Sequence, residues 1–268
     1  MVADDRSGSA VPQPPLSFDR VAHEYDETRG GVERGDRHAA AVLEHLDGNA
    51  RCLEIGVGTG AVALGVVRRG LRVCGVDVST AMLRHAAARL GHVVVAADAR
   101  RLPVRDASIA QAYSVWLLHL VDDLATMLAE VARVLRRGGC YVVIPAGGQV
   151  EDEGDPVARL VADLERRLLP DVEAGPRPSI ERLRTLGAAA GLELEAVDAL
   201  PTATYEESPE QTASNLERRT FSMCWPLDDE GFAREVAPVV AALRALPDTA
   251  RLRRRRARRE VIAILRRA

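Results

Sequence analysis

The chain contains 268 residues, of which 47% are hydrophobic and 28% are charged, and its formal net charge is −3. This composition is typical of a globular protein and excludes a chain that is disordered throughout. The longest apolar runs have the length of strands and the four cysteines form no CxxC pair, so neither a transmembrane helix nor a zinc or redox motif is predicted.

The N-terminal half alternates between helical and strand patterns after a polar start. Residues 1–17 are rich in Pro, Ser, Gly and Asp, and we expect a disordered tail without the basic and apolar regions of a signal peptide. We expect residues 18–268 to form a single domain. Helices are predicted at residues 36–46, 61–69, 79–90 and 122–136, and strands at residues 51–55, 72–76, 92–97, 109–114 and 140–144. The strands are almost continuously apolar, which indicates an α/β fold with a doubly wound, mostly parallel sheet covered by helices on both faces.

The pattern is less regular after residue 145. Helices are predicted at residues 156–169, 179–190, 209–221 and 228–246, with one strand inside residues 192–204 and a last strand at residues 260–265. Because the segment between the last two strands is mainly helical, we interpret residues 207–247 as a helical insertion, or cap, before the last strand.

The C-terminal segment 251–268 differs in charge from the rest of the chain. It holds nine arginines and one acid, Glu260, although the whole chain has 36 basic and 39 acidic residues. A basic segment on an acidic body indicates either a polyanionic partner or a solvated face that pairs with that body. We expect residues 253–256 to lie in the connection before the last strand. The cysteine usage favours a reducing, cytoplasmic location.

A glycine-rich loop follows the first predicted strand and precedes a helix, where the backbone must come close to a ligand. Gly56, Gly58 and Ala61 satisfy a dinucleotide-binding fingerprint, and Asp77 lies at the spacing expected for a ribose ligand. Alternatively, Glu54 and the glycines form one unit. A carboxylate repels a pyrophosphate but attracts a cation, and S-adenosylmethionine carries a sulfonium and an ammonium group but no phosphate.

Five motifs resemble, in the same order, those of the class I S-adenosylmethionine-dependent methyltransferases, in the small-molecule branch that includes the quinone-biosynthesis C-methyltransferases. The motifs are Glu54 to Gly60, Gly75 to Ser79 with Met82, Ala97 to Pro103, Ser114 to His119, and Leu135 to Gly139. Upstream, Phe18 to Ala22 and Tyr25 to Arg29 resemble the N-terminal helix of the family. The resemblance covers residues 18–145 well and the remainder in outline. The chain has Ile109-Ala110 where the family has Phe-Asp, and we expect this to alter local hydrogen bonding.

The resemblance implies a Rossmann-like fold that binds S-adenosylmethionine, with S-adenosylhomocysteine as the product and no metal. It implies that Asp77 binds the ribose, that Asp98 and the following amide contact the adenine, and that a Tyr–Arg pair closes over the methionine carboxylate. The cofactor-binding residues that it implies are Tyr25, Arg29, Glu54, Gly56, Gly58, Thr59, Gly60, Asp77, Val78, Met82, Asp98, Ala99 and Ser114.

The chemistry itself demands few protein groups. The methyl group of a sulfonium is already activated, so the protein mainly supplies alignment and desolvation, and a base is needed only where the acceptor must lose a proton. His119 is the candidate base, because it follows the fourth strand at the expected mouth of the site; packing against a helix is the alternative. The candidate substrate-binding residues are Trp116, His119, Arg219 and Trp225. Core packing would explain the tryptophans equally well, and surface exposure would explain the arginine.

The sequence therefore predicts an enzyme that transfers a methyl group from S-adenosylmethionine to a small-molecule acceptor, with natural-product biosynthesis as one setting. Two alternatives stay open. The arginine-rich segment suggests a methyltransferase that acts on RNA, but no Asn/Asp-Pro-Pro-Tyr segment follows the fourth strand to accept a flipped base. The second alternative is a protein with the same fold that binds the cofactor without transferring a methyl group. We expect a small-molecule partner, no nucleic-acid or membrane partner, and a monomer or homodimer.

Overall fold

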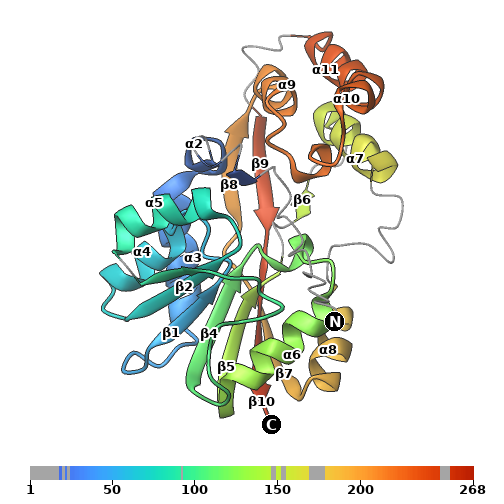
Figure 1. Cartoon of the computed structure of the whole chain (residues 1–268). Helices are drawn as coiled ribbons and strands as arrows, with labels where there is room; N and C mark the ends of the chain where they lie inside the picture. Colours follow the sequence, from blue (N-terminus) through green and yellow to red (C-terminus); the bar gives the residue numbers. More distant parts are fainter. Residues whose placement is uncertain are drawn as a thin grey trace, which may run out of the picture.

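The computed structural model describes residues 18–19, 22, 25–91, 93–145, 149–151, 155–168, 179–247 and 254–268. Its centre is a seven-stranded sheet with the strand order β3-β2-β1-β4-β5-β10-β7 (Figure 1). Neighbouring strands from β3 to β5 run parallel, and β10 is antiparallel to both β5 and β7. The strands are β1 Cys52–Ile55, β2 Val73–Asp77, β3 Val94–Ala96, β4 Ile109–Val115, β5 Leu135–Ile144, β7 Leu192–Ala199 and β10 Val261–Arg267. The predicted α/β, mostly parallel sheet is confirmed, whereas the expected tail at residues 1–17 lies outside the described residues.

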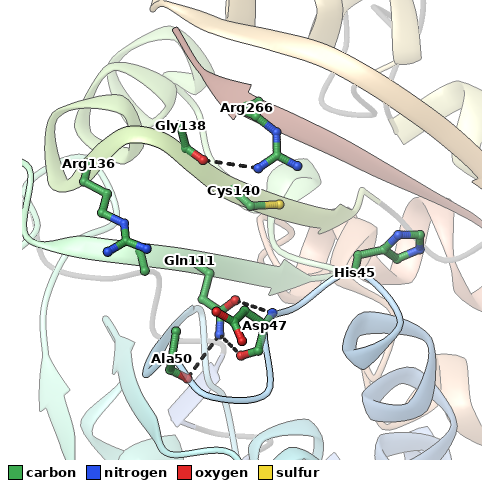
Figure 2. A pocket seen from close by; sticks show the side chains of 9 residues that line it. His45, Asp47, Ala50, Gln111, Arg136, Gly138, Cys140 and Arg266 are labelled. Carbon is green, nitrogen blue, oxygen red and sulfur yellow. Dashed lines mark hydrogen bonds between the residues drawn. The ribbon is translucent and has the colours of Figure 1, made fainter.

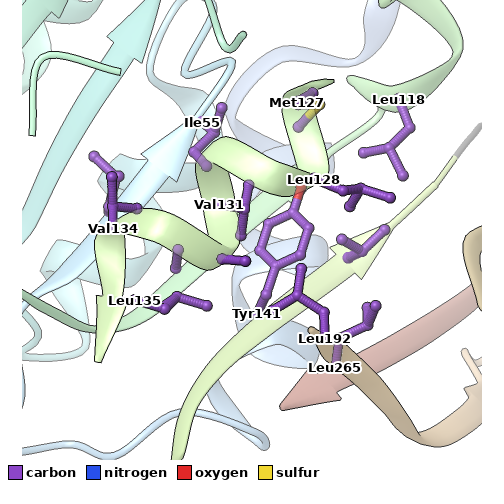
Figure 3. Close-up of a cluster of buried hydrophobic side chains, with 14 of the residues drawn as sticks. Ile55, Leu118, Met127, Leu128, Val131, Val134, Leu135, Tyr141, Leu192 and Leu265 are labelled. Atoms are coloured by element: carbon purple, nitrogen blue, oxygen red, sulfur yellow. The ribbon is translucent and has the colours of Figure 1, made fainter. Parts of the chain in front are cut away.

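Helices cover both faces of this sheet. On one face, the helices contribute side chains to a buried cluster with β1, β4 and β10; they are α3 Gly31–Leu43, α4 Ala61–Arg68 and α5 Thr80–Leu90. On the other face lie α6 Leu124–Val134 and α8 Ile180–Ala189. Figure 3 shows the second cluster around the fully buried ring of Tyr141, with Met127, Leu128 and Val131 of α6 beside it. The apolar side chains of α6 recur at helical spacing, which is why this helix packs on the sheet along one stripe.

Capping side chains fix the starts of α5 and α6. The Ser79 Oγ atom accepts a hydrogen bond from the Met82 amide at the start of α5. At the start of α6, Asp123 is the cap, and its carboxylate accepts a hydrogen bond from the Thr126 amide at 3.0 Å. Several helix bounds differ from the prediction, and two of these differences have a clear reason. Helix α3 begins at residue 31 and not at 36, because its first turn is polar and so lies outside the apolar pattern. Helix α6 ends at Val134, because the following residues already belong to β5.

The cap is larger than predicted and has a hydrophobic core of its own. Three of its helices, α9 Pro209–Glu217, α10 Asp229–Glu235 and α11 Ala237–Arg244, lie within the predicted segment 207–247, together with the 3-10 turn η2 Ser222–Cys224. A fourth helix, α7 Pro156–Leu168, comes from before β7 and packs with them. The fully buried residues of this core include Leu164, Leu216, Cys224, Val236 and Leu243. In Figure 1 the cap lies at the end of the molecule opposite to the chain's C-terminus. Because β10 is antiparallel, this is the end at which the parallel strands finish.

A second, three-stranded antiparallel sheet connects the cap with the main sheet. Its order is β6 Gln149–Glu151, β9 Arg254–Arg259 and β8 Ala203–Glu207. The prediction that residues 253–256 lie in a connection is wrong for residues 254–256, which belong to β9, and residue 253 lies outside the described residues. An arginine-rich run resembles a solvated loop, but a backbone ladder between strands needs no apolar side chains. Among the described residues, no helix is both long and apolar enough to cross a membrane.

Candidate functional site

The candidate site lies where the strand order of the sheet reverses, between β1 and β4. Ligands of doubly wound folds bind beyond the carboxyl ends of the strands at this point. After β1, the chain turns through Gly56 and Gly58, whose φ angles of 77° and 53° fall in the left-handed region that favours glycine. A Cβ atom on Gly56 would approach the Leu117 side chain to 2.8 Å, whereas one on Gly58 would meet no atom within 4 Å. The loop is therefore closely packed on one side and open at Gly58.

Asp77, at the end of β2, is held against this loop. One of its carboxylate oxygens accepts a hydrogen bond from the Gly58 amide at 2.8 Å, and the other accepts from the Ser79 amide at 2.9 Å. Burial raises the pKa of Asp77, although these two hydrogen bonds favour its ionised form. The carboxylate thus has a fixed orientation beside the open side of the loop, and an ionised oxygen has lone pairs left for a hydroxyl donor.

Glu54 lies on β1 below the loop and is 2% exposed. The Tyr113 hydroxyl of the neighbouring strand β4 donates a hydrogen bond to its carboxylate at 3.0 Å. Burial raises the pKa of Glu54 to about 8; the hydrogen bond from Tyr113 counteracts this, and the nearby charge of Asp77 adds to it. A buried carboxyl group of this kind gains most from a cation bound close to it, because the cation stabilises the ionised form.

The residues expected at the adenine lie along β2, β3 and their loops. The Val78 side chain is 40% exposed beside Asp77, whereas Met82 on α5 is 1% exposed and supports the loop from inside. Asp98, beyond β3, forms a hydrogen-bonded ion pair with Arg100 at 2.7 Å, and this pair lowers the pKa of Asp98. Ala99, which follows Asp98, is half-buried. These side chains line the same end of the sheet as the glycine loop.

Two aspartates of the N-terminal segment bind the loops of the site. The Thr59 hydroxyl of the glycine loop donates to the Asp26 carboxylate at 2.7 Å, and Arg89 of α5 also pairs with Asp26. Burial opposes ionisation of Asp26, but the hydrogen bonds from Arg89 and Thr59 outweigh it and lower the pKa. Asp19 accepts a hydrogen bond from the Ser79 hydroxyl at 2.6 Å. Sequence reasoning missed both roles, although both aspartates lie in the N-terminal motifs.

The N-terminal Tyr–Arg pair belongs to the short helix α2, Tyr25–Arg29. Tyr25 is half-buried, and the segment around it is brought to the glycine loop by the neighbouring Asp26. The side chain of Arg29 lies outside the described part of the structure, so its expected contact with a carboxylate stays a prediction.

The segment after β4 contributes buried and half-buried side chains. The Ser114 hydroxyl is fully buried and lies 2.6 Å from the Tyr141 hydroxyl, so only its backbone is available to a ligand. Trp116 is half-buried with a φ angle of 56°, which is unusual for a bulky residue. Its indole N–H donates to Glu260 at 2.9 Å. His119 lies on the 3-10 turn η1, Leu118–Leu120, and is half-buried.

Trp225 and Arg219 both lie in the cap. The indole N–H of Trp225 donates to the Arg219 carbonyl at 2.8 Å, and its ring contacts Phe18 edge to face at 4.5 Å. The cap therefore touches the N-terminal segment next to Asp19. The Arg219 guanidinium pairs with Asp229 at 2.7 Å and donates to the Leu227 carbonyl at 2.8 Å. Through these contacts Arg219 stabilises a loop of the cap itself. They therefore support a structural role for Arg219 more than a contact with substrate.

A cavity of about 310 Å³ lies at the opposite end of the sheet, where the parallel strands begin. Figure 2 shows Gln111, Arg136, Cys140 and Arg266 along it. The first three come from the starts of β4 and β5, and Arg266 from the end of the antiparallel β10. The Gln111 side chain is engaged with backbone atoms of Asp47 and Ala50. This cavity is thus separate from the glycine loop and Asp77.

The group implied by the resemblance, S-adenosylmethionine, fits the residues present. The loop is open at Gly58, Asp77 faces it with an oriented carboxylate, and the buried Glu54 below it disfavours a phosphate and favours a cation. Among the residues that the structure describes, no cluster of three or more His, Cys, Asp or Glu side chains is arranged to hold a metal ion.

Comparisons with known proteins agree with this geometry. Residues 53–143 match the family model described as a methyltransferase domain. The chain is 34% identical over 136 residues to the demethylmenaquinone methyltransferase of Thermobifida fusca, a match that covers 47% of this chain and 58% of the relative. It is 30% identical over 113 residues to a sterol 4-C-methyltransferase of Caenorhabditis elegans, covering 40% of this chain and 34% of the relative. The chain thus spans less than two thirds of the length of these relatives.

Solved structures share the fold over most of the chain. The [4+2]-cyclase SpnF has a TM-score of 0.57 at 22% identity, covering 94% of this chain and 95% of its own. A putative methyltransferase from Bacillus halodurans has a TM-score of 0.54 at 17% identity, covering 85% of this chain and 97% of its own. The resemblance expected from the motifs is confirmed for residues 53–143, and the methyltransferase fold is confirmed for the main sheet and its helices.

Proposed function

We propose that this chain is an S-adenosylmethionine-dependent methyltransferase that acts on a small molecule. The observation that carries the proposal is the contact between the Gly58 amide and Asp77 at the switch point, directly above the buried Glu54. It combines a ribose-binding carboxylate with a second acid where a dinucleotide enzyme would place a pyrophosphate. The match of residues 53–143 to the methyltransferase domain supports the same conclusion.

Three groups of residues form the cofactor site, one for each part of the cofactor. Asp77 accepts hydrogen bonds from the ribose hydroxyls, and Val78, Asp98 and Ala99 surround the adenine, while the buried Met82 supports this part of the site from inside. The glycine loop with Thr59, together with Glu54 and the Ser114 backbone, surrounds the methionine part. Tyr25 and Arg29 cover its carboxylate. When bound, this group supplies an activated methyl group on a sulfonium.

The remaining work of the protein is to align the acceptor and to exclude water. The cap lies at the same end of the sheet as the site and has its own core, so it is a stable cover rather than a loose loop. Trp225 joins it to the N-terminal segment through Phe18. We infer that the acceptor binds between this cover and the segment after β4, where Trp116 and His119 lie.

Isothermal titration calorimetry with S-adenosylhomocysteine and with NADH tests the proposal. We expect S-adenosylhomocysteine to bind with an affinity on the order of micromolar and NADH to give no heat. Binding of NADH without a response to S-adenosylhomocysteine would contradict it. If S-adenosylhomocysteine binds but no small-molecule acceptor is methylated, the result would favour a protein that binds the cofactor without transferring a methyl group. Tight, salt-sensitive RNA binding would favour the nucleic-acid alternative.

A further inference from the structure

A buried polar cluster joins three distant parts of the chain next to the candidate site. Glu260, between β9 and β10, is its centre, and both Glu260 and His38 have side chains that are 1% exposed. The carboxylate of Glu260 lies 3.1 Å from His38 Nε2, accepts from the Trp116 indole at 2.9 Å and pairs with Arg37 at 3.3 Å. The His38 and Trp116 rings meet edge to face at 5.3 Å.

These contacts fix the protonation pattern of the imidazole. A carboxylate only accepts hydrogen bonds, so the Nε2 atom of His38 must carry the proton that it shares with Glu260. In the neutral ring, Nδ1 is then the bare nitrogen, which can only accept a hydrogen bond. Nδ1 is buried and has no hydrogen-bond partner among the described residues. A buried acceptor without a donor is costly, so this atom is suited to receive a proton donor from a ligand.

The cluster is close to both the glycine loop and the end of β4. Helix α3 packs tightly on the start of α4, since a Cβ atom on Gly35 would lie 2.5 Å from the Ala61 carbonyl oxygen. His38 is one helical turn further along α3 and contacts Trp116, the first residue after β4. The His38 imidazole therefore stands between the loop proposed to hold the methionine part and the segment proposed to hold the acceptor.

We propose that His38, oriented by Glu260, is the proton acceptor for an aromatic hydroxyl compound bound against Trp116. This inference rests on the proposed function and names the acceptor class for it. The hydroxyl supplies the donor that Nδ1 lacks, and the indole supplies a flat apolar surface for the ring. The oxygen gives its proton to Nδ1 and forms one bond to the transferred methyl carbon, while the carbon–sulfur electron pair stays on the sulfur of the sulfonium donor. Glu260 stabilises the resulting imidazolium.

Trp116, the proposed surface for the acceptor, is held in an unusual backbone conformation beside the buried ring. Its φ angle of 56° is strained for a bulky side chain. Three contacts hold it there: its amide donates a hydrogen bond to the Ile144 carbonyl, its indole N–H donates one to Glu260, and the Arg34 guanidinium stacks on its ring at 4.0 Å. Such strain is characteristic of functional sites.

The test follows the ¹⁵N resonances of histidine in protein saturated with S-adenosylhomocysteine, during titration with phenol and with anisole. We expect a bare Nδ1 in His38 and a shift of its resonance with phenol but not with anisole, which has no hydroxyl to donate. A protonated Nδ1, no shift with phenol, or equal shifts with both probes would overturn the proposal. Failure of S-adenosylhomocysteine to bind is measured separately and contradicts the proposed function instead.

Two variants extend the test to the proton transfer itself. His38→Gln keeps an N–H for Glu260 but removes the bare nitrogen, and His45→Gln is the matched control just beyond the same helix. With S-adenosylmethionine and phenol, we expect anisole formation in the wild type, a loss of about 100- to 10,000-fold in His38→Gln, and no change in His45→Gln. Phenol that shifts Nδ1 but yields no anisole, or equal rates in both variants, would overturn the role of His38. Should His38→Gln not fold, the titration of the wild type decides alone.

Discussion

Replacement of Glu54 by Gln tests the electrostatics of the site most directly. Glu54 is buried below the glycine loop, and burial raises its pKa to about 8. At pH 6, roughly one hundredth of such a group is ionised, and at pH 8 about one half. If a bound cation needs the ionised form, the affinity for S-adenosylhomocysteine rises about 50-fold between pH 6 and pH 8 and then levels. In Glu54→Gln, which cannot ionise, we expect weak binding without this dependence.

The same substitution has the opposite effect on the stability of the unliganded protein. The pKa of Glu54 in the folded state lies above its ordinary value of 4.5, so folding favours the protonated form. Its favourable contribution is complete below pH 4.5 and is lost as the pH rises to about 8. The shift corresponds to up to about 5 kcal/mol. Gln cannot ionise, so Glu54→Gln does not lose stability as the pH rises. We expect its free energy of unfolding at pH 8 to exceed that of the wild type.

Calorimetry in two buffers of different ionisation enthalpy measures the proton released on binding, and urea unfolding across pH measures the stability. We expect close to one proton released at pH 7 in the wild type and none in Glu54→Gln. Exposed Glu195→Gln on β7, remote from the loop, is the control. An affinity that is the same at pH 6 and pH 8, or a variant that binds as tightly as the wild type, would refute the assignment of Glu54 to a cationic ligand.

Three other substitutions probe separate parts of the site. Asp77→Ala should weaken S-adenosylhomocysteine binding about 10- to 150-fold, because carboxylate hydrogen bonds are worth about 1.5–3 kcal/mol, whereas exposed Asp198→Ala should not; equal calorimetric affinities would contradict the ribose role. Trp225→Ala should speed S-adenosylhomocysteine dissociation in stopped-flow measurements by releasing Phe18 beside Asp19, while Trp225→Phe, which keeps a ring there, should not. Replacing the arginines at 254–256 by Gln should leave the affinity within a few-fold. RNA binding that is lost in that variant and falls steeply with salt would instead support a nucleic-acid substrate.

The parallel strands and the glycine loop could be predicted because both are local in sequence. Short apolar runs that end at Gly56 or Asp77 identify strands and their carboxyl ends without knowledge of any partner. The cap was harder to predict. Its helices are amphipathic and readable, but the sequence does not show that Leu164, before β7, packs with Leu216, after β8. Helix α7 therefore seemed unrelated to the insertion.

Glu260 shows the same limit at the level of a single side chain. In the sequence it is the lone acid in an arginine-rich segment, and charge balance explains it completely. In the structure, the antiparallel entry of β10 between β5 and β7 brings it to the end of β4, more than 140 residues away in sequence, beside Trp116. Sequence reasoning selected Trp116 for its position and His119 as the base. The histidine that the fold pairs with a buried carboxylate is His38, on a helix before the first strand. The proton chemistry proposed for this site thus depends on β10, the last strand of the chain, and only the completed fold places Glu260 beside His38 and Trp116.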